Sequence, residues 1–403
     1  MFQNLDRLNP DAILGLMAKF RIDAFSQKVD LGVGVYRDSS GNTPVLECVR
    51  RAEQMVLAAQ TSKSYVAAAG REEYNAAIEE LVLGASHPAR RDRRARTVQA
   101  PGGCGALRVG AELIRAAAAK ASPSTVTVHV SDPTWGNHIP LLGSSGLRLE
   151  RYPYYDAKSH ELRFEAMLER LDRAPAGDVV VLHASCHNPT GADLTQGQWR
   201  TLAELMQQRR LVPFLDLAYQ GFGADLAADV AGVRFITEAL PESLIAVSNS
   251  KNLGLYRERV GALIVIGEND SRADAVRSHV LQIARSIYSM PPDHGAAIAA
   301  CIFADPNLRQ GWQAELEQMR ARLREMRTLL AAHLREATRD GSFDFIENQH
   351  GMFSLLGVSR TAVEALRETH HIYMLDDSRM NIAGIMPHNV AYLAESIAAE
   401  RFD

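Results

Sequence analysis

Short apolar runs recur through the middle of the chain, and helix-length amphipathic segments lie between several of them. The runs are continuous and rich in Val, Ile and Leu, which is typical of strands buried on both faces. Strand–helix alternation of this kind indicates an α/β fold with a mostly parallel sheet flanked by helices. The expected strands span 126–131, 178–185, 211–216, 243–248 and 261–266, and one intervening helix spans 198–208.

The hydrophobic pattern changes after Pro292 from alternating strands and helices to one long charged helix followed by short apolar runs. This change predicts a smaller α+β domain that closes against the first. The N-terminal 45 residues look irregular and are expected to pack with the smaller domain. The expected elements there are a long charged helix at 308–335, short apolar runs at 343–346, 352–356 and 380–383, and a helix near 361–370. The predicted division is 1–45 as the N-terminal segment, 46–307 as the large domain, and 308–403 as the linking helix with the small domain.

Composition and charge narrow the possible functions. The chain has 403 residues, of which 46% are hydrophobic and 23% charged, an ordinary globular balance. Its net charge of −4 argues against a nucleic-acid-binding role. Five arginines lie within His87–Arg96. We interpret this run as a solvated loop, with contact to an acidic partner as the alternative.

Cysteine use and hydropathy bear on the compartment. The N-terminus lacks a signal-peptide pattern, and no apolar run is long enough to span a bilayer. The four cysteines are far apart and form no CxxC pair, which favours a reducing compartment over a disulfide framework or a zinc site. We therefore expect a soluble, cytoplasmic protein with no metal, no membrane partner and no nucleic-acid partner. The cysteines are Cys48, Cys104, Cys186 and Cys301.

The strongest local signal is SNSKNLGLYRERVG at 248–261. A strand ends at Ser248, and Lys251 follows at its carboxyl end, where open α/β sheets bind ligands. Schiff-base chemistry needs a lysine with a lowered pKa beside a phosphate site. Ser248, Ser250 and Arg259 could supply that phosphate site. The stretch alone is equally compatible with a surface loop that carries ordinary charges.

A second signal is DLAYQG at 216–221. Asp216 ends an apolar run, and a carboxylate beside a pyridine nitrogen keeps that nitrogen protonated, so that the ring can accept electrons. Tyr219 could reach a phenolic oxygen on the same ring. An ordinary helix N-cap aspartate is the alternative.

Two turns add to these signals. Residues 97–107, TVQAPGGCGAL, pass through glycines into a helix, a turn that can present backbone N–H groups to an anion. The turn lacks the G-x-G-x-x-G spacing and a P-loop lysine, which argues against a nucleotide site. Residues 187–191, HNPTG, follow another strand. The Asn-Pro there is either an ordinary turn or a cis bond that directs a side chain toward a site.

Taken in order along nearly the whole chain, these motifs resemble those of the class I aminotransferases, in the aspartate and aromatic amino-acid branch. The resemblance implies fold type I of the enzymes that depend on pyridoxal 5'-phosphate, and a homodimer with shared active sites. The matching segments include VDLGVGVYRDSSGNTPVL (29–46), KSYVAAAG (63–70), DPTWGNH (132–138), HASCHNPTG (183–191), DLAYQGF (216–222), SKNLGLYRERVG (250–261), ARSIYSMPPDHGA (284–296), GMFS (351–354) and SRMNIAG (378–384).

The resemblance also implies roles for single residues. Lys251 forms the Schiff base with the cofactor and carries the proton, Asp216 pairs with the ring nitrogen, and Tyr219 binds the phenolic oxygen. Arg379 clamps the substrate α-carboxylate, and Arg285 crosses the dimer interface to bind a side-chain carboxylate. The other implied contacts are Gly103, Cys104, Ser248, Ser250 and Arg259 around the phosphate, Tyr65 from a second subunit, Trp135 on the ring, His138 and His183 behind Asp216, Asn188 on the phenolic oxygen, and Gly34, Trp135 and Asn188 at the substrate.

Ordinary structural roles are the alternatives for several of these residues. A buried histidine is usually structural, a tryptophan is usually a core residue, and a lone arginine is usually a solvated surface charge. Only the surrounding motifs favour the functional interpretation.

Three residues depart from the pattern of that family. Cys104 stands where Thr or Ser is usual and offers only a weak S–H donor. Asn249 replaces an aromatic or hydroxyl residue, and Met290 replaces a polar residue, commonly Asn. Near the mouth of the site, Val35 and Thr43 are similar to the aspartate enzymes, whereas Ser64 and Met290 match neither branch.

The sequence therefore predicts a transaminase that exchanges the amino group between glutamate/2-oxoglutarate and either aspartate or an aromatic amino acid, by ping-pong chemistry. A different reaction on the same cofactor, β-elimination or decarboxylation, is one alternative. A non-catalytic pyridoxal-phosphate-binding module is another. Incubation with glutamate separates them, because only a transaminase releases 2-oxoglutarate.

Overall fold

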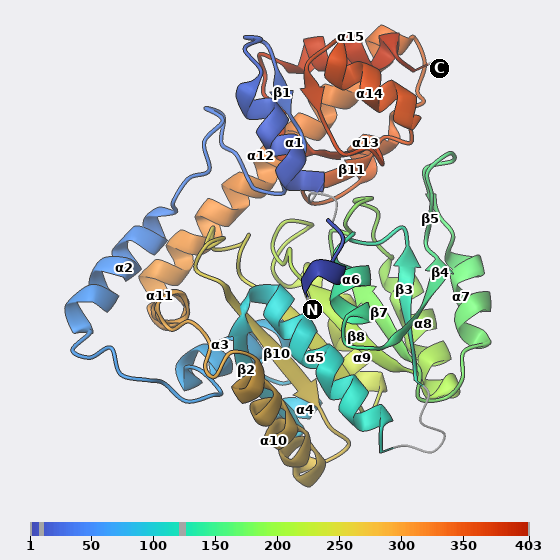
Figure 1. Ribbon diagram of the computed structural model, residues 1–403. Helices are drawn as coiled ribbons and strands as arrows, with labels where there is room; N and C mark the ends of the chain where they lie inside the picture. Colours follow the sequence, from blue (N-terminus) through green and yellow to red (C-terminus); the bar gives the residue numbers. More distant parts are fainter. Residues whose placement is uncertain (1, 8–11, 121–125, 402–403) are drawn as a thin grey trace.

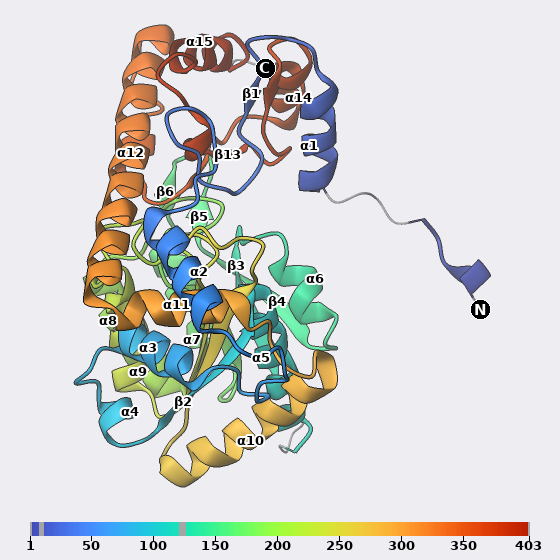
Figure 2. The ribbon, with the colours of Figure 1, turned by 90° about the vertical axis from the view of Figure 1, so that its left-hand side faces the viewer.

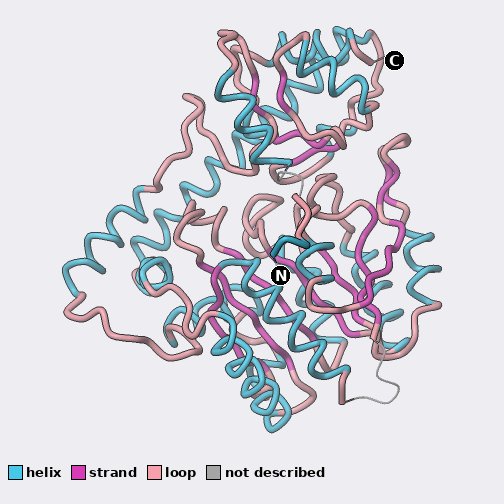
Figure 3. Tube along the Cα trace, viewed as in Figure 1, coloured by secondary structure: helices cyan, strands magenta, loops and turns pink. Residues whose placement is uncertain are grey.

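A seven-stranded sheet forms the centre of the structure, a computed structural model that describes residues 2–7, 12–120 and 126–401 (Figure 3). From β9 to β4 all neighbouring strands are parallel, whereas β10 runs antiparallel to both β9 and β2. The predicted mostly parallel α/β sheet is confirmed. In spatial order the strands are β2 (Ala95–Pro101), β10 (Val260–Ile266), β9 (Ser243–Ser248), β8 (Val212–Leu217), β7 (Val179–His183), β3 (Thr127–Asp132) and β4 (Arg148–Pro153).

Burial explains which strands the sequence reveals. Every residue of β9 and β10 is buried, so both read as continuous apolar runs. The edge strand β4 has only one buried residue and a charged sequence, RLERYP, and no strand is expected there from the pattern.

Helices cover both faces of the sheet. Successive strand residues point to opposite faces, so Phe214 and Leu215 enter two separate hydrophobic cores. One core lies under α5 (Gly102–Ala118) and α10 (Asp270–Ile287). The other is covered by α3 (Glu72–Leu83), α7 (Phe164–Asp172), α8 (Gln196–Arg209), α9 (Ala231–Ala239) and α11 (His294–Ala304).

A 33-residue helix, α12 (Pro306–Thr338), leads from this body to a smaller α+β unit (Figures 1 and 2). Two small sheets lie there, β1 with β12 and β11 with β13. The elements of this unit are α1 (Ala12–Ile22), β1 (Val29–Asp30), α13 (Phe345–Asn348), β11 (Phe353–Leu355), α14 (Arg360–Glu368), β12 (Ile372–Tyr373), β13 (Arg379–Asn381) and α15 (Val390–Ala399). The remaining α-helices and strands are α2 (Glu47–Ala59), α4 (Pro88–Arg91), α6 (His138–Gly143), β5 (Tyr155–Asp156) and β6 (Glu161–Leu162).

The N-terminal segment is more regular than expected. Residues 1 and 8–11 lie outside the described residues, but α1 is helical and β1 pairs with β12. The expectation of an irregular segment holds for residues 31–46 but missed α1 and β1, because the pairing of Val29 with Ile372 is set by residues more than 340 positions away. The expected packing against the small unit is present: the Asp23 carboxylate accepts hydrogen bonds from Tyr373 and His371, at 2.7 Å each.

The arginine-rich run is a loop only in part. Residues 88–91 form α4 and residues 95–96 begin β2, whereas residues 92–94 form the turn between them, and several of the arginines are paired with carboxylates. Arg96 contacts Asp274 at 2.7 Å and also Asp270, and Arg90 contacts Glu79 at 3.3 Å. Partners supplied by other elements therefore fix the run. None of the helices in the described part of the chain has an apolar stretch long enough to cross a lipid bilayer.

Candidate active site

A cavity of about 260 Å³ opens where the carboxyl ends of β7, β8 and β9 meet the N-terminus of α5. His183 and Ser248 are the last residues of their strands, and Asp216 is the second-last residue of β8. Ligands of open α/β sheets bind at this edge. The lining residues are Ile13, Gly34, Gly103, Cys104, Leu107, Trp135, His183, Asn188, Asp216, Ala218, Tyr219, Ser248, Ser250, Lys251, Tyr256, Arg259, Phe353 and Arg379.

One end of the cavity is suited to an anion. Gly102 begins α5 with a φ of +69°, a conformation that favours glycine, and an added Cβ would lie 2.5 Å from a guanidinium nitrogen of Arg259, which would have to shift. Arg259 donates to Tyr256 O at 2.9 Å and to Ser250 Oγ at 3.5 Å, and it has no carboxylate partner among the described residues. The helix N-terminus, the hydroxyls of Ser248 and Ser250, and an uncompensated arginine favour a phosphate group.

Asp216 lies at another part of the same wall and is 5% exposed. Burial alone raises the pKa of its carboxyl, but the hydrogen bond from His138, 2.9 Å from Nε2 to Oδ2, and the charges nearby hold the pKa below its ordinary value. The other nitrogen of His138, Nδ1, lies 2.8 Å from Thr134 Oγ1. Asp216 is therefore an anion that His138 orients from behind.

His183 stands next to this pair without a hydrogen-bond partner on either ring nitrogen. Burial lowers its pKa well below the ordinary value, so the ring is neutral. The ligand atoms of His138, His183 and Asp216 lie within 4.8 Å of one another, a spacing that a metal ion could use. The His138–Asp216 hydrogen bond already occupies two of these atoms.

Lys251 reaches the cavity from the turn after β9, with Nζ 5.0 Å from the centre of the Tyr219 ring. Desolvation lowers the pKa of its amine, and the positive charges of Arg259 and Arg379 act in the same direction, against Asp216. A lowered pKa increases the fraction of neutral amine, the form that acts as a nucleophile or a base.

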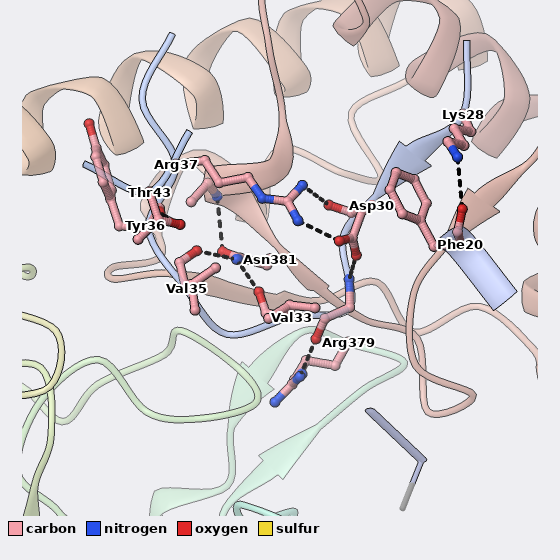
Figure 4. Close-up of polar contacts among 12 residues, drawn as sticks. Phe20, Lys28, Asp30, Val33, Val35, Tyr36, Arg37, Thr43, Arg379 and Asn381 are labelled. Carbon is pink, nitrogen blue, oxygen red and sulfur yellow. Dashed lines mark hydrogen bonds and ion pairs between the residues drawn. The ribbon is translucent and has the colours of Figure 1, made fainter. Parts of the chain in front are cut away.

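Arg379, at the start of β13, brings the small unit into the site. It is 4% exposed, and its Nη2 donates to Gly32 O at 2.8 Å (Figure 4). Its Nη1 donates to Asn188 Oδ1 at 3.3 Å. Its guanidinium carbon lies 4.4 Å from the centre of the Phe353 ring. Among the described residues no carboxylate pairs with Arg379, and its Nε has no acceptor. This arginine is therefore open to a carboxylate that a ligand would bring.

The N-terminal segment supports Arg379 through its backbone. The carbonyl that accepts from Arg379 is that of Gly32, whereas the predicted contact, Gly34, lines the cavity two residues later. A Cβ on Gly34 would lie 3.1 Å from the tip of Phe353. Asn381 fixes the intervening backbone, because Nδ2 donates to Val33 O at 2.6 Å and to Val35 O at 2.8 Å (Figure 4).

Most of the predicted site residues line this cavity. Three of the predicted residues, His138, Tyr65 and Arg285, do not. His138 is behind Asp216, as expected. Tyr65 is 91% exposed and does not reach the cavity of its own chain. Arg285 is exposed near the end of α10, where Nη1 donates to Ser289 Oγ at 2.6 Å.

Sequence reasoning gave no role to several lining residues. Phe353 and Tyr256 lie in segments with a family resemblance, and that signal could have identified them. The Tyr256 hydroxyl accepts from Tyr36 N at 2.9 Å, which ties the lysine turn to the N-terminal segment. Ile13 reaches the cavity from α1, and no motif marks it. The Asn188–Pro189 bond is cis, one of the two alternatives for that turn.

The residues present fit pyridoxal phosphate. A phosphate needs a cationic cradle of N–H and O–H donors, which the α5 turn, Ser248, Ser250 and Arg259 provide. A pyridinium needs a buried anion, which Asp216 provides. An amine with a lowered pKa lies in the same cavity.

Comparisons with known proteins agree with this geometry. The sequence profile of the family described as aminotransferase class I and II matches residues 26–397. The aspartate aminotransferase of Escherichia coli K12 is 43% identical over 399 residues, which cover 99% of this chain and 100% of that protein. The aromatic-amino-acid aminotransferase of Paracoccus denitrificans is 42% identical over 98% of this chain and 99% of its own length.

A solved structure is similar over the same extent. The crystal structure of the aromatic-amino-acid aminotransferase from Burkholderia pseudomallei, covalently bound to pyridoxal phosphate, superimposes with a TM-score of 0.96 at 41% identity. The match covers 100% of this chain and 99% of that one.

Proposed function

This chain belongs to the class I and II aminotransferase family, and from that premise we propose that it exchanges the amino group between glutamate/2-oxoglutarate and either aspartate or an aromatic amino acid. It is a pyridoxal-phosphate-dependent enzyme. The two branches of the family supply the two candidates for the second substrate.

One observation carries the proposal: a single cavity holds an amine with a lowered pKa, a buried anion and a buried arginine without a carboxylate partner. An amino acid has the groups that complement them. Its α-carboxylate would pair with Arg379, and its amino group and α-hydrogen would then lie on the Lys251 side of the cavity.

The cofactor would be held by the groups around this cavity. When bound, pyridoxal phosphate supplies an aldehyde that forms Schiff bases with amines and a ring that accepts electrons. Asp216 would pair with the ring nitrogen, and Tyr219 and Asn188 would donate to the phenolic oxygen. The phosphate would be held by Gly103, Cys104, Ser248, Ser250 and Arg259. Trp135 would stack on the face of the ring, and His138 and His183 would support Asp216 from behind.

Lys251 would serve as the general acid and base. Its Nζ takes up the proton that leaves the substrate α-carbon, and the same Nζ later returns a proton. Burial and the two arginines lower the pKa of the amine, which keeps more of it in the basic form. Positioned proton transfer of this kind contributes about 10²–10⁴-fold to a rate.

We also propose that two chains form a homodimer and share their sites. Tyr65 and Arg285 do not line the cavity of their own chain, yet the segments that carry them are neighbours, because Val66 N donates to Met290 Sδ at 3.4 Å just beyond the end of α10. A twofold axis would present both residues to the partner's cavity, and each chain would then lend the same pair. Arg285 would bind the side-chain carboxylate of glutamate or aspartate.

A panel of amino donors tests the substrate assignment. With 2-oxoglutarate as acceptor, we expect the highest kcat/KM for aspartate or for an aromatic amino acid. Arg285→Ala should raise KM for glutamate and aspartate far more than for phenylalanine or tyrosine. Equal losses for all donors would contradict the role of Arg285. Release of ammonia or CO2 without conversion of 2-oxoglutarate to glutamate would favour elimination or decarboxylation, and no conversion at all would favour a binding module.

Subunit mixing tests the shared site. Lys251→Ala and Arg285→Ala chains, unfolded and refolded together in equal amounts, should form about one half mixed dimers, with one intact site in each mixed dimer. About a quarter of all sites should then show wild-type character. No recovery despite verified subunit exchange would contradict the shared site and leave the cofactor assignment in place.

A further inference from the structure

The turn that carries Lys251 has two sides. Ser248, Ser250 and Lys251 line the cavity. Asn249 and Asn252 do not, and they are 0% and 1% exposed. Two buried amides on the back of this turn need hydrogen-bond partners, because an unpaired amide inside a protein is costly.

A chain of buried hydrogen bonds supplies those partners. The Tyr74 hydroxyl of α3, which is fully buried, donates to Asn249 Oδ1 at 2.6 Å. Asn249 Nδ2 donates to Asn252 Oδ1 at 3.2 Å. The two asparagines are therefore fixed to each other across Lys251 and to the helix behind it.

The chain closes into a ring on the same helix. Asn252 Nδ2 donates to Gln220 O at 3.3 Å, and Gln220 Nε2 donates to Leu81 O at 3.3 Å. Leu81 and Tyr74 both belong to α3. Gln220 directly follows Tyr219, so the ring joins the lysine turn to the turn of its cavity neighbour.

The N-terminal part of α12 provides a further hydrogen bond to this turn. Trp312 is fully buried, and its Nε1 donates to Asn252 O at 2.6 Å. Two elements, α3 and α12, therefore hold the backbone beside Lys251 from behind.

We propose that Tyr74, Asn249 and Asn252 are positioning residues for Lys251. They touch neither the cavity nor a ligand in it. They fix the turn that presents the lysine amine and keep it in register with Tyr219. This inference rests on the proposed function, in which Lys251 binds the cofactor and carries the proton.

The expected effect follows from the role of Lys251. A proton-transfer group must lie within hydrogen-bond reach of the reacting atoms, and a misplacement of about 1 Å can cost about 10²-fold in rate. Arg379 binds the substrate carboxylate without help from this ring. Loosening the ring should therefore lower kcat and leave KM nearly unchanged.

The test compares two buried tyrosines. Tyr74→Phe removes the first donor of the ring. Tyr152→Phe removes a hydroxyl that is equally buried and donates to Val181 O at 2.8 Å, outside the cavity. Three measurements are made on the enzyme loaded with pyridoxal phosphate: the single-turnover rate with glutamate, the pH midpoint of the cofactor absorbance, which reports the protonation of the Lys251 Schiff base, and the urea midpoint.

We expect both variants to lose stability to a similar degree. Only Tyr74→Phe should slow the single turnover, by about tenfold, with KM for glutamate changed less than about twofold, and only this variant should shift the absorbance midpoint. Adding Asn249→Ser to Tyr74→Phe should cause little further loss, because both substitutions cut the same chain.

The proposal is overturned if Tyr74→Phe matches Tyr152→Phe in rate and in absorbance midpoint, since the ring would then be only structural. Should Tyr74→Phe fail to fold, Asn249→Ser alone cuts the chain one bond further on and is judged by the same criteria. If the wild-type enzyme does not convert glutamate, the proposed function fails, and the absorbance midpoint still decides whether the ring positions Lys251.

Discussion

Replacing Arg379 by methionine should cost activity but little stability. Arg379 is buried with its charge unpaired by any carboxylate among the described residues, and desolvation lowers the pKa of its guanidinium. Two hydrogen bonds, to Gly32 O and Asn188 Oδ1, offset part of the cost of burying this charge. Methionine loses both hydrogen bonds, which contribute about 1.5–3 kcal/mol each to stability. It also removes a charge whose burial destabilises the folded state by several kcal/mol.

These opposing contributions nearly cancel in the enzyme without substrate. We expect the free energy of unfolding of Arg379→Met to lie within about 2 kcal/mol of wild type. With substrate bound, the α-carboxylate would be left buried and unpaired, a loss of about 3–5 kcal/mol. That loss corresponds to a fall of about 10²–10⁴-fold in kcat/KM for glutamate.

Arg327→Met is the matched control. Arg327 is buried like Arg379, at 2% against 4% exposed, but its guanidinium donates five hydrogen bonds, to Ser354 Oγ and to the carbonyls of residues 346, 350, 351 and 353. Burial lowers its pKa to about 10, so it stays charged at neutral pH. Removing it leaves five acceptors unpaired and should cost at least about 3 kcal/mol of stability.

Urea unfolding and steady-state kinetics, measured on wild type and both variants, decide the matter. We expect a large kinetic loss with little destabilisation for Arg379→Met, and the larger destabilisation for Arg327→Met. If Arg379→Met is destabilised as much as Arg327→Met, or keeps kcat/KM within about tenfold of wild type, Arg379 is a structural residue.

Three further predictions concern single residues. Lys251→Ala should lower turnover by at least about 10²–10⁴-fold and abolish the covalent cofactor absorbance, and near-normal transamination would disprove its role. Cys104→Thr should lower the dissociation constant of pyridoxal phosphate, since an S–H group is a weaker donor than a hydroxyl, and an unchanged or higher constant would contradict this. Burial raises the pKa of Asp193 to about 6 from 3.8, so the folded state holds its proton more tightly than the unfolded state does. Its destabilising contribution is absent below pH 3.8, grows as pH rises to 6, and reaches about 3 kcal/mol above pH 6. Relative to Asp193→Asn, wild type should lose about that much free energy of unfolding between pH 4 and pH 7, and a constant difference would refute the shift.

The sequence predicts those site residues well whose role can be recognised from the neighbouring residues in the chain. Asp216 lies at the end of a buried strand, Lys251 follows one and Arg259 directly precedes one, so strand ends and spacing identify them. Ile13 was not predictable, because it reaches the cavity only through the packing of α1 with distant segments. The arginine run shows the same limit: Arg96 pairs through its backbone with Val265 and through its side chain with Asp274, neither of which is near in sequence.

The back of the lysine turn shows another limit. Asn249 stands out in the sequence as a departure from the family pattern, which suggests altered cofactor retention. The structure instead turns its side chain away from the cavity, toward Tyr74. Sequence alone could not show this, since the direction of a side chain in a turn depends on the backbone around it.

A half-reaction with glutamate alone tests whether this enzyme transaminates. The purified enzyme, loaded with pyridoxal phosphate and freed of excess cofactor, is mixed with glutamate in the absence of any acceptor. We expect each site to release one 2-oxoglutarate while the aldehyde form of the cofactor is converted to its amine form, and added aspartate- or aromatic-derived 2-oxo acid should reverse the change. Cofactor absorbance and 2-oxoglutarate concentration that both stay unchanged with glutamate would contradict transamination at this site.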